Sequence, residues 1–242
     1  MNPLPEDAQG PNKSDPAVAA EVQKYVSVVR PNAGMIGIAF PGTFLLDRRG
    51  RVTSRFFEDF YIERNTVSSL MMKLGGKAES VAATKVSTGH LDLTTYPSDP
   101  AVAPGNRFSL ALTIEPHAHI HVYAPGATGY RSVGLTITVQ PFVRVLPMRY
   151  PKSETYFFKP LNEHVPVYQK AFTLVQEVIV EGTPAAQAAL RGKDALTLTG
   201  ALEYQACDDK ECFNPASVPL SWTMTLRPLV TERPARPPQE RP

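Results

Sequence analysis

Cys207 and Cys212 are the only cysteines of the chain, and four residues separate them. They lie in the segment Tyr204-Gln-Ala-Cys-Asp-Asp-Lys-Glu-Cys-Phe-Asn-Pro215. Two thiols at this spacing can close an intramolecular disulfide and reopen it through a mixed disulfide with another molecule. Two cysteines cannot by themselves supply the four ligands of a structural zinc site. The segment therefore predicts either a redox-active dithiol or a structural disulfide that staples a hairpin.

The residues between the cysteines bear on the reactivity of the two thiols. Asp208, Asp209 and Glu211 are acidic, and Lys210 offsets them only in part. Neighbouring carboxylates disfavour the thiolate, which is the attacking species in exchange. We therefore expect thiols with an ordinary or raised pKa that react slowly unless a partner docks.

Composition excludes several other functions. The chain of 242 residues carries a net charge of +2 and has no block of lysine and arginine, which argues against nucleic acid as its main partner. No apolar run approaches the roughly 20 residues that a membrane-spanning helix needs, and the N-terminus has no visible secretory signal. With 43% apolar residues the chain is expected to be globular. Its oligomeric state is left open.

No motif predicts a cofactor or a metal. There is no glycine-rich phosphate loop, no Gly-x-Ser-x-Gly elbow and no His-Glu-x-x-His helix. His117, His119 and His121 alternate, so on a strand they would share one face and two of them could chelate a metal. No cluster of carboxylates or cysteines completes such a site in the sequence, and a polar strand face explains the histidines equally well.

From Thr84 onward the pattern is one of short strands punctuated by Pro and Gly turns. The expected strands are 86–93, 107–115, 120–123, 135–139, 143–146, 171–180, 195–205 and 217–226. Many short strands without interleaved helices predict an antiparallel β-sandwich over residues 84–228, with one short helix at 184–190. Residues 229–242 form a Pro-rich tail that is expected to be disordered.

The first third of the chain has a different pattern. A loose lead-in is expected over residues 1–14, followed by a helix that ends at 31–34. Two strands, 44–46 and 52–57, are joined by the Asp47-Arg-Arg-Gly50 turn. A second helix follows, with Val67, Leu70, Met71 and Leu74 expected on one face. A short linker of small and polar residues, 77–83, leads to the sandwich.

Residues 15–76 resemble the C-terminal half of a thioredoxin-like or peroxiredoxin-like domain. The resemblance rests on Pro41-Gly-Thr-Phe-Leu-Leu-Asp-Arg-Arg-Gly-Arg-Val52, in which Pro41 matches the cis-proline that precedes the strand, hairpin and final helix of that family. The family's front half, with its catalytic cysteine, is absent, because no cysteine precedes position 207. The segment is therefore expected to be a partial redoxin domain with a small α/β fold.

Residues 84–228 resemble the N-terminal domain of the thiol:disulfide interchange protein DsbD family. The family reads Tyr-Gln-x-Cys, a short spacer, Cys-aromatic-x-Pro and then Val-Pro, which Tyr204 to Cys207, Cys212 to Pro215 and Val218-Pro219 match in order. The resemblance implies an immunoglobulin-like sandwich in a mainly β chain. It also implies electron relay with thioredoxin-like partners, in the periplasm or another extracytoplasmic compartment of bacteria.

The resemblance also suggests supporting residues. In the family an aromatic from a cap loop shields the disulfide, and the stretch Tyr156 to His164 would place Phe157 or Phe158 there. Both could equally be core aromatics. Tyr204 is expected to flank the cysteine pair, although a buried sheet tyrosine would give the same pattern. The expected function is thiol–disulfide exchange through Cys207 and Cys212, and the alternative is a non-catalytic binding module with a structural disulfide.

Overall fold

The computed structural model describes residues 42–57, 63–76, 83–159 and 162–229. It divides the chain into two compact units, Met1–Tyr61 and Ile62–Pro242. Among the described residues, no helix combines the length and the apolar character that crossing a membrane requires.

The described part of the first unit is a β-hairpin, as predicted. Strands β1 (Gly42–Leu46) and β2 (Val52–Phe57) pair antiparallel. The carboxylate of Asp47 closes the turn, because its Oδ1 accepts hydrogen bonds from the backbone N–H groups of Arg49 and Arg51, at 2.8 and 3.0 Å. Pro41, the lead-in 1–14 and the first expected helix lie outside the described residues. The partial redoxin domain therefore stays a prediction.

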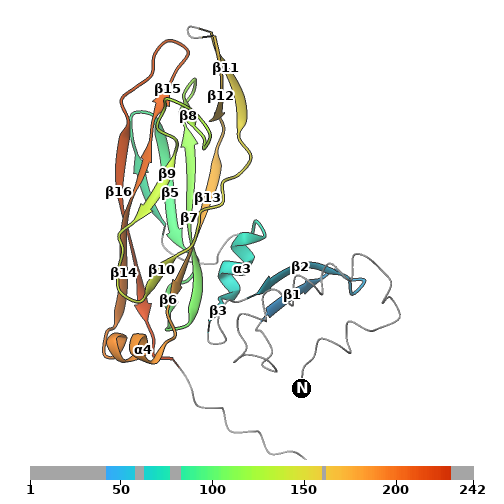
Figure 1. The fold of residues 1–242 in the computed structure, drawn as a ribbon, viewed down its shortest axis with the longest axis vertical. Coiled ribbons are helices and arrows are strands. Elements are labelled where there is room, and N and C mark those ends of the chain that lie inside the picture. Colours follow the sequence, from blue (N-terminus) through green and yellow to red (C-terminus); the bar gives the residue numbers. More distant parts are fainter. Residues whose placement is uncertain (1–41, 58–62, 77–82, 160–161, 230–242) are drawn as a thin grey trace, which may run out of the picture. The chain divides into compact units, whose positions relative to one another are not determined.

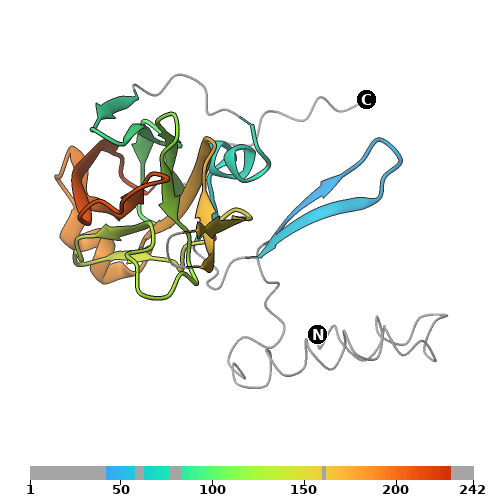
Figure 2. The ribbon, with the colours of Figure 1, turned by 90° about the horizontal axis from the view of Figure 1, so that it is seen from above.

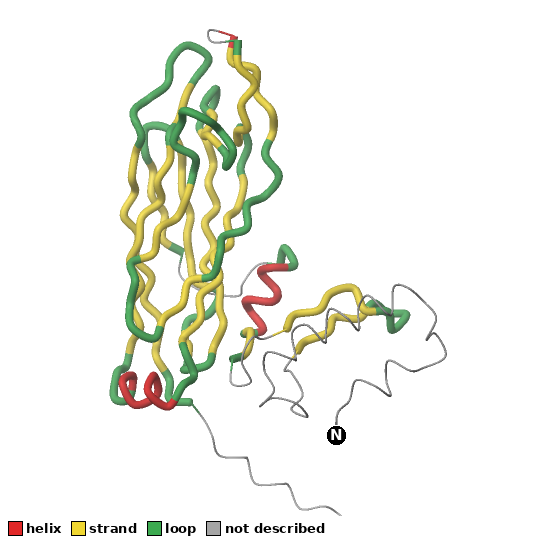
Figure 3. Tube along the Cα trace, viewed as in Figure 1, coloured by secondary structure: helices red, strands yellow, loops and turns green. Residues whose placement is uncertain are grey.

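Strands are the main secondary structure in the described part of the second unit (Figure 3), where they form three sheets. In the first sheet the strand order is β10-β13-β7-β5-β4, and β3 also pairs with β7. The second sheet has the order β6-β16-β14-β9, and the third has the order β11-β12-β8-β15. The bounds are β3 Arg64–Asn65, β4 Thr84–Ser87, β5 Leu91–Pro97, β6 Ala101–Val102, β7 Asn106–Pro116, β8 His121–Tyr123, β9 Gly134–Ile137, β10 Val143–Val145, β11 Glu154–Phe158, β12 Glu163–Tyr168, β13 Phe172–Val180, β14 Ala195–Tyr204, β15 Ala206–Cys207 and β16 Ala216–Leu226.

The first two sheets pack face to face around one hydrophobic core. Figure 2 shows the strands of this unit in a view from above. Strand β16 shows the cause, because its buried and exposed residues alternate along its whole length from Ser217 to Leu226. A period of two places every second side chain on the same face of a sheet. Trp222 of β16 reaches across the core, where its indole Nε1 donates a hydrogen bond of 2.9 Å to Thr95 Oγ1 of β5. The predicted mainly β, antiparallel sandwich is confirmed.

Two short helices belong to this unit, α3 (Val67–Lys73) and α4 (Pro184–Leu190). Helix α4 has the predicted bounds and follows the cap residue Thr183, with a proline at its start. It lies at the end of the sandwich opposite to β8, β11, β12 and β15 (Figure 1). The third sheet therefore forms the other end of the sandwich.

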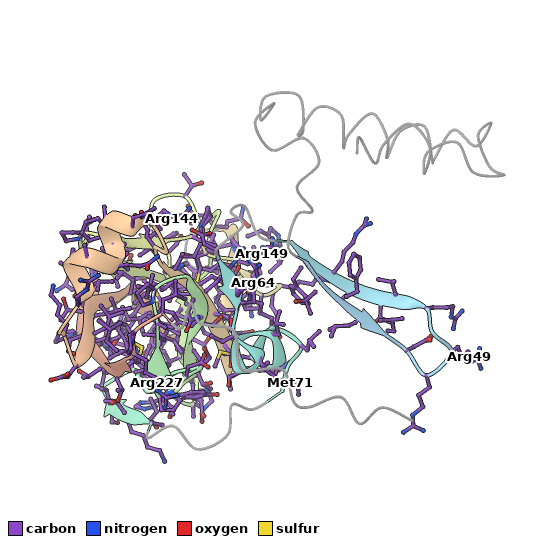
Figure 4. All side chains as sticks on the ribbon, turned by 90° about the horizontal axis from the view of Figure 1, so that it is seen from below. Arg49, Arg64, Met71, Arg144, Arg149 and Arg227 are labelled. Atoms are coloured by element: carbon purple, nitrogen blue, oxygen red, sulfur yellow. A yellow bond between two sulfur atoms is a disulfide. The ribbon has the colours of Figure 1, made fainter. Side chains whose placement is uncertain are left out.

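The apolar face that was expected for α3 is largely exposed. Val67, Met71 (labelled in Figure 4) and Leu74 are between 48% and 76% exposed. The buried residues are Ser69, Leu70 and Met72. Polar contacts select this face, because Ser69 Oγ lies 2.7 Å from Ser109 Oγ of β7. Of the four apolar residues expected on one face, Leu70 is the one that is buried.

These contacts also bear on the domain division. Lys73 of α3 forms an ion pair with Glu177 of β13, and Arg107 of β7 donates two hydrogen bonds to the same carboxylate. Both cations hold the pKa of the Glu177 carboxyl below its ordinary value, against the desolvation that raises it. Residues 63–76 thus pack with the sandwich, whereas the sequence assigned them to the N-terminal segment. Most of the expected linker, 77–82, lies outside the described residues.

Candidate redox site

A disulfide joins Cys207 and Cys212 at the end of the sandwich that the third sheet forms. Cys207 is the last residue of β15, and the intervening residues fold into a compact loop. The backbone N–H of Asp208 donates to the carbonyl of Glu211 at 3.0 Å. In return, the N–H groups of Lys210 and Glu211 donate to Asp208 Oδ1 at 2.7 and 2.8 Å. Asp208 therefore shapes the loop that holds the two sulfur atoms together.

The same hydrogen bonds keep Asp208 ionised. The N–H groups of Glu211 and Lys210 stabilise the carboxylate, so the pKa of Asp208 lies below its ordinary value of 3.8. A fixed negative charge thus adjoins Cys207 in the chain. It disfavours formation of a second negative charge on that sulfur when the disulfide is reduced.

The two cysteines differ sharply in exposure. Cys207 is fully buried, with 0% of its surface exposed, whereas Cys212 is exposed. Exchange requires the attacking thiolate to reach a sulfur in line with the S–S bond, so access decides which sulfur is attacked. If an incoming thiolate attacks the more exposed Cys212, Cys207 is the leaving group. Sequence reasoning left this order open.

Tyr123 of β8 contacts both sulfur atoms. Its hydroxyl lies 3.0 Å from Cys207 Sγ and 3.3 Å from Cys212 Sγ. The disulfide carries no hydrogen, so the tyrosine hydroxyl is the donor. Burial raises the pKa of Tyr123 far above its ordinary value of 10.0, and Tyr130 raises it further, so the hydroxyl stays protonated. A permanent donor thus faces the sulfur that becomes a thiolate when Cys212 is attacked.

Two further tyrosines cover this part of the sheet. Tyr130 stacks on Tyr123, with ring centroids 4.1 Å apart, and its hydroxyl donates to Glu163 at 2.9 Å. Tyr156 of β11 packs against a small cluster that contains Tyr123 and Cys207. The Tyr156 hydroxyl donates to Asp209 Oδ1 at 2.7 Å, which ties β11 to the cysteine loop. That hydrogen bond is the main reason why the pKa of Tyr156 is raised.

His121 lies beside Cys207 in the sheet. The two residues are direct cross-strand partners where β8 pairs with β15. His121 is 1% exposed, and its ring packs 4.4 Å from the ring of Tyr156. Burial lowers the pKa of His121 below its ordinary value of 6.5, and the charges of Asp209 and Asp208 oppose this effect only in part.

Two other residues of the cysteine motif, Gln205 and Tyr204, contact segments outside the cysteine loop. Gln205 accepts a hydrogen bond from the Arg131 N–H through Oε1, at 2.9 Å, and donates through Nε2 to the Phe213 carbonyl, at 3.1 Å. Tyr204 is buried in the main core, and its hydroxyl lies 3.0 Å from Thr88 Oγ1 rather than beside a sulfur atom. The His90 ring lies 4.4 Å from the Phe213 ring and 6.3 Å from the Tyr204 ring, between ring centroids.

The stretch that was expected to form a cap loop, 156–164, is instead the hairpin β11–β12. Its register pairs Tyr156 with Val165, Phe157 with His164 and Phe158 with Glu163. Tyr156 and Val165 belong to the cluster around Cys207, so Phe157 must point to the opposite face of the sheet. Accordingly, Phe157 is 41% exposed and stacks on His164 at 4.8 Å. Phe158 is buried, on the same face as Tyr156.

Sequence reasoning thus missed Tyr123, Tyr130, Tyr156 and His121 as neighbours of the disulfide. Tyr123 and His121 could have been found through their i, i+2 spacing, which places both on one face of a strand. Of the three alternating histidines, only His121 lies in a strand. His117 and His119 lie in the connection before β8, where His119 has a φ of 66°. Among the described residues, no group of three or more His, Cys, Asp or Glu side chains is placed to hold a metal.

No protein-family model matches the chain, and no curated protein matches it. Two solved structures are similar in fold. One is the N-terminal periplasmic domain of ScsB from Proteus mirabilis, with 15% identity and a TM-score of 0.42, covering 58% of this chain and 51% of that domain. The other is the Neisseria meningitidis DsbD N-terminal domain in the reduced form, with 10% identity and a TM-score of 0.33, covering 48% of this chain and 81% of that domain. This chain thus spans about half the length of the ScsB structure.

Proposed function

We propose that this protein exchanges thiols and disulfides with thioredoxin-like proteins through Cys207 and Cys212. One observation carries the proposal: an exposed residue, Cys212, is disulfide-bonded to a fully buried residue, Cys207, whose sulfur already accepts a hydrogen bond from Tyr123. A structural staple needs neither the exposed cysteine nor the hydroxyl donor. The motif that resembles the DsbD family points to the same chemistry.

The geometry fits a two-step exchange. A partner thiolate attacks Cys212 Sγ, the Cys207–Cys212 bond breaks, and the electron pair leaves on Cys207, where the Tyr123 hydroxyl stabilises it. The partner is then held in a mixed disulfide with Cys212. A second thiol of the partner attacks its own sulfur in that bond and releases Cys212 as a thiol. The partner leaves with a disulfide, and this chain keeps two electrons and two protons. The reverse sequence would oxidise this chain.

The alternative function is a binding module with a structural disulfide. The complete burial of Cys207 favours it, because structural bonds are commonly shielded. The exposure of Cys212 argues against it. The two functions differ in whether the disulfide opens on contact with a thioredoxin-like protein.

We place this exchange outside the bacterial cytoplasm. The support is the resemblance of Tyr204 to Pro219 to the DsbD family, together with a disulfide of the kind that persists in oxidising compartments. The natural partner would then be an extracytoplasmic thioredoxin-like protein.

The proposal is tested by comparing two reductants of the oxidised chain. A reduced bacterial thioredoxin should open the disulfide at least about a hundredfold faster than glutathione at equal thiol concentration, because docking positions the attacking sulfur. Alkylation followed by mass measurement counts the opened disulfides over time. Equal rate constants for the two reductants would speak for the structural alternative.

Tyr156→Ala should weaken this discrimination. The substitution removes the ring that packs over the Cys207 cluster and the hydrogen bond to Asp209. Reduction by glutathione should accelerate by about tenfold, equivalent to about 1.4 kcal/mol, because the released cysteine loop can align the Cys207–Cys212 bond with a thiolate that attacks Cys212. Reduction by thioredoxin should change less, because a docked partner aligns its attacking sulfur itself.

Phe157→Ala is the matched control, since Phe157 is the next residue of β11 and faces away from the cluster. Its glutathione rate constant should stay within about twofold of the wild type, a difference of about 0.4 kcal/mol. If both alanine variants accelerate equally, Tyr156 does not restrain the cysteine loop specifically.

A further inference from the structure

His121 carries a buried nitrogen that lacks a partner. Among the described residues, its Nε2 is the buried side-chain nitrogen or oxygen for which the structure provides no hydrogen bond. Buried polar atoms are nearly always paired, so such an exception in a site points to a function in another state of the protein. The state that differs here is the dithiol form, in which the neighbouring sulfur gains a hydrogen.

The sheet places His121 next to the sulfur that gains this hydrogen. Cross-strand partners have their side chains on the same face, with Cβ atoms about 4.5–5.5 Å apart. Cys207 is the cross-strand partner of His121, and Tyr123 lies two residues further along the same strand. The His121 ring stands edge-on to the Tyr123 ring, with centroids 5.7 Å apart. The His121 and Cys207 side chains therefore lie on the same face of the sheet, beside the Tyr123 ring.

The groups around His121 leave it as the available base. Tyr123 and Tyr156 have raised pKa values and stay protonated, so neither takes a proton near neutral pH. The charges that face His121 are those of Asp208 and Asp209. Asp208 is engaged by two backbone N–H groups, and Asp209 accepts the Tyr156 hydroxyl. Burial keeps the imidazole neutral at neutral pH, and it is thus ready to accept a proton.

We propose that His121 accepts the proton of the Cys207 thiol when Cys207 resolves a mixed disulfide on Cys212. The proposal rests on the exchange function above and adds to it the residue that activates the buried thiol. A thiol that is surrounded by apolar and acidic groups ionises poorly. The attack of the buried Cys207 on Cys212 therefore needs a nearby proton acceptor.

The step balances as follows. The Cys207 thiol transfers its proton to His121, and the Cys207 thiolate attacks Cys212 Sγ. The Cys207–Cys212 bond forms while the bond between Cys212 and the partner breaks, and the partner leaves as a thiolate. The imidazolium then releases its proton to solvent or to that thiolate. The chain loses two electrons, and the partner disulfide gains them.

Dithionitrobenzoate, a small coloured aromatic disulfide, separates this step from the first attack. The reduced chain releases one thionitrobenzoate when Cys212 attacks, and a second when Cys207 resolves the mixed disulfide. Two kinetic phases in a stopped-flow trace thus report the two cysteines separately. In the wild type, the second phase should slow as the pH falls through the lowered pKa of His121, below 6.5, and should level off above it.

His121→Phe keeps the ring that stacks on Tyr156 but removes the proton acceptor. Its first phase should stay within about twofold of the wild type. Its second phase should slow by at least about tenfold, at the low end of what a positioned base contributes. The plateau should also disappear, because the rate constant must then rise with pH up to the pKa of the Cys207 thiol. His164→Phe is the matched control, since His164 stacks on Phe157 on the opposite face of the sheet.

A second phase in His121→Phe with the wild-type rate constant and pH profile would overturn the inference while leaving the exchange function intact. A missing first phase in the wild type would instead contradict the exchange function itself, and the inference with it. If His121→Phe fails to fold, the wild-type profile decides: a second phase whose rate constant shows no break below pH 6.5 overturns the proton transfer.

Discussion

The two single-cysteine variants should differ in thiol reactivity by about a hundredfold, which corresponds to about 2.7 kcal/mol. In Cys207→Ser the remaining thiol is the exposed Cys212, and it should react with dithionitrobenzoate as fast as its ionisation allows. In Cys212→Ser the remaining thiol is the fully buried Cys207. The reagent can reach Cys207 only when the cover of Tyr130 and Tyr156 opens, and such local opening costs free energy.

Denaturation supplies the control for this comparison. In concentrated urea the burial is lost, and the two thiols should react with similar rate constants. A native Cys207 thiol that reacts as fast as the native Cys212 thiol would contradict the assignment of Cys212 as the attacked sulfur and of Cys207 as the leaving group.

Trp222→Ala should have the largest effect on stability, lowering the free energy of unfolding by about 3–5 kcal/mol. Trp222 is the chain's one tryptophan, is 3% exposed, and spans the core from β16 to Thr95 of β5. A loss of this size is a large part of the roughly 5–15 kcal/mol that stabilises a typical domain. Urea unfolding of the oxidised chain, followed by far-UV circular dichroism, measures it.

Two milder variants separate burial from hydrogen bonding. Trp222→Phe keeps most of the apolar contact, and Thr95→Val leaves the indole N–H without its acceptor at a cost of about 1–3 kcal/mol. Both should be more stable than Trp222→Ala. A Trp222→Ala protein that unfolds within about 1 kcal/mol of the wild type would show that the two sheets are held together elsewhere.

Several strands of the sandwich were predictable because apolar and polar residues alternate along them. Strand β16 places every second residue in the core, and helix α4 carries its own start signals, Thr183 and Pro184. These are local patterns, and they specify local structure. The same holds for the hairpin β1–β2, whose turn depends on the side chain of Asp47.

The surroundings of the disulfide were not predictable, because they depend on pairings between distant segments. Tyr123 and Cys207 are 84 residues apart, and only the register of β8 with β15 and β12 brings the site together. In β11, consecutive aromatic residues conceal the alternation, so the sequence predicted a loop in which Phe157 or Phe158 would be the cap. Helix α3 shows the same limit, since Ser109 on another strand decides which face is buried.

The reduction potential of the Cys207–Cys212 couple tests the central proposal most directly. The oxidised chain is equilibrated in glutathione or dithiothreitol buffers of known potential, and alkylation of both cysteines gives the reduced fraction. An exchange partner of thioredoxin-like proteins should have a midpoint between about −270 and −120 mV, the range from thioredoxin to strong oxidants. A midpoint below about −300 mV, as in structural disulfides of secreted proteins, would contradict it.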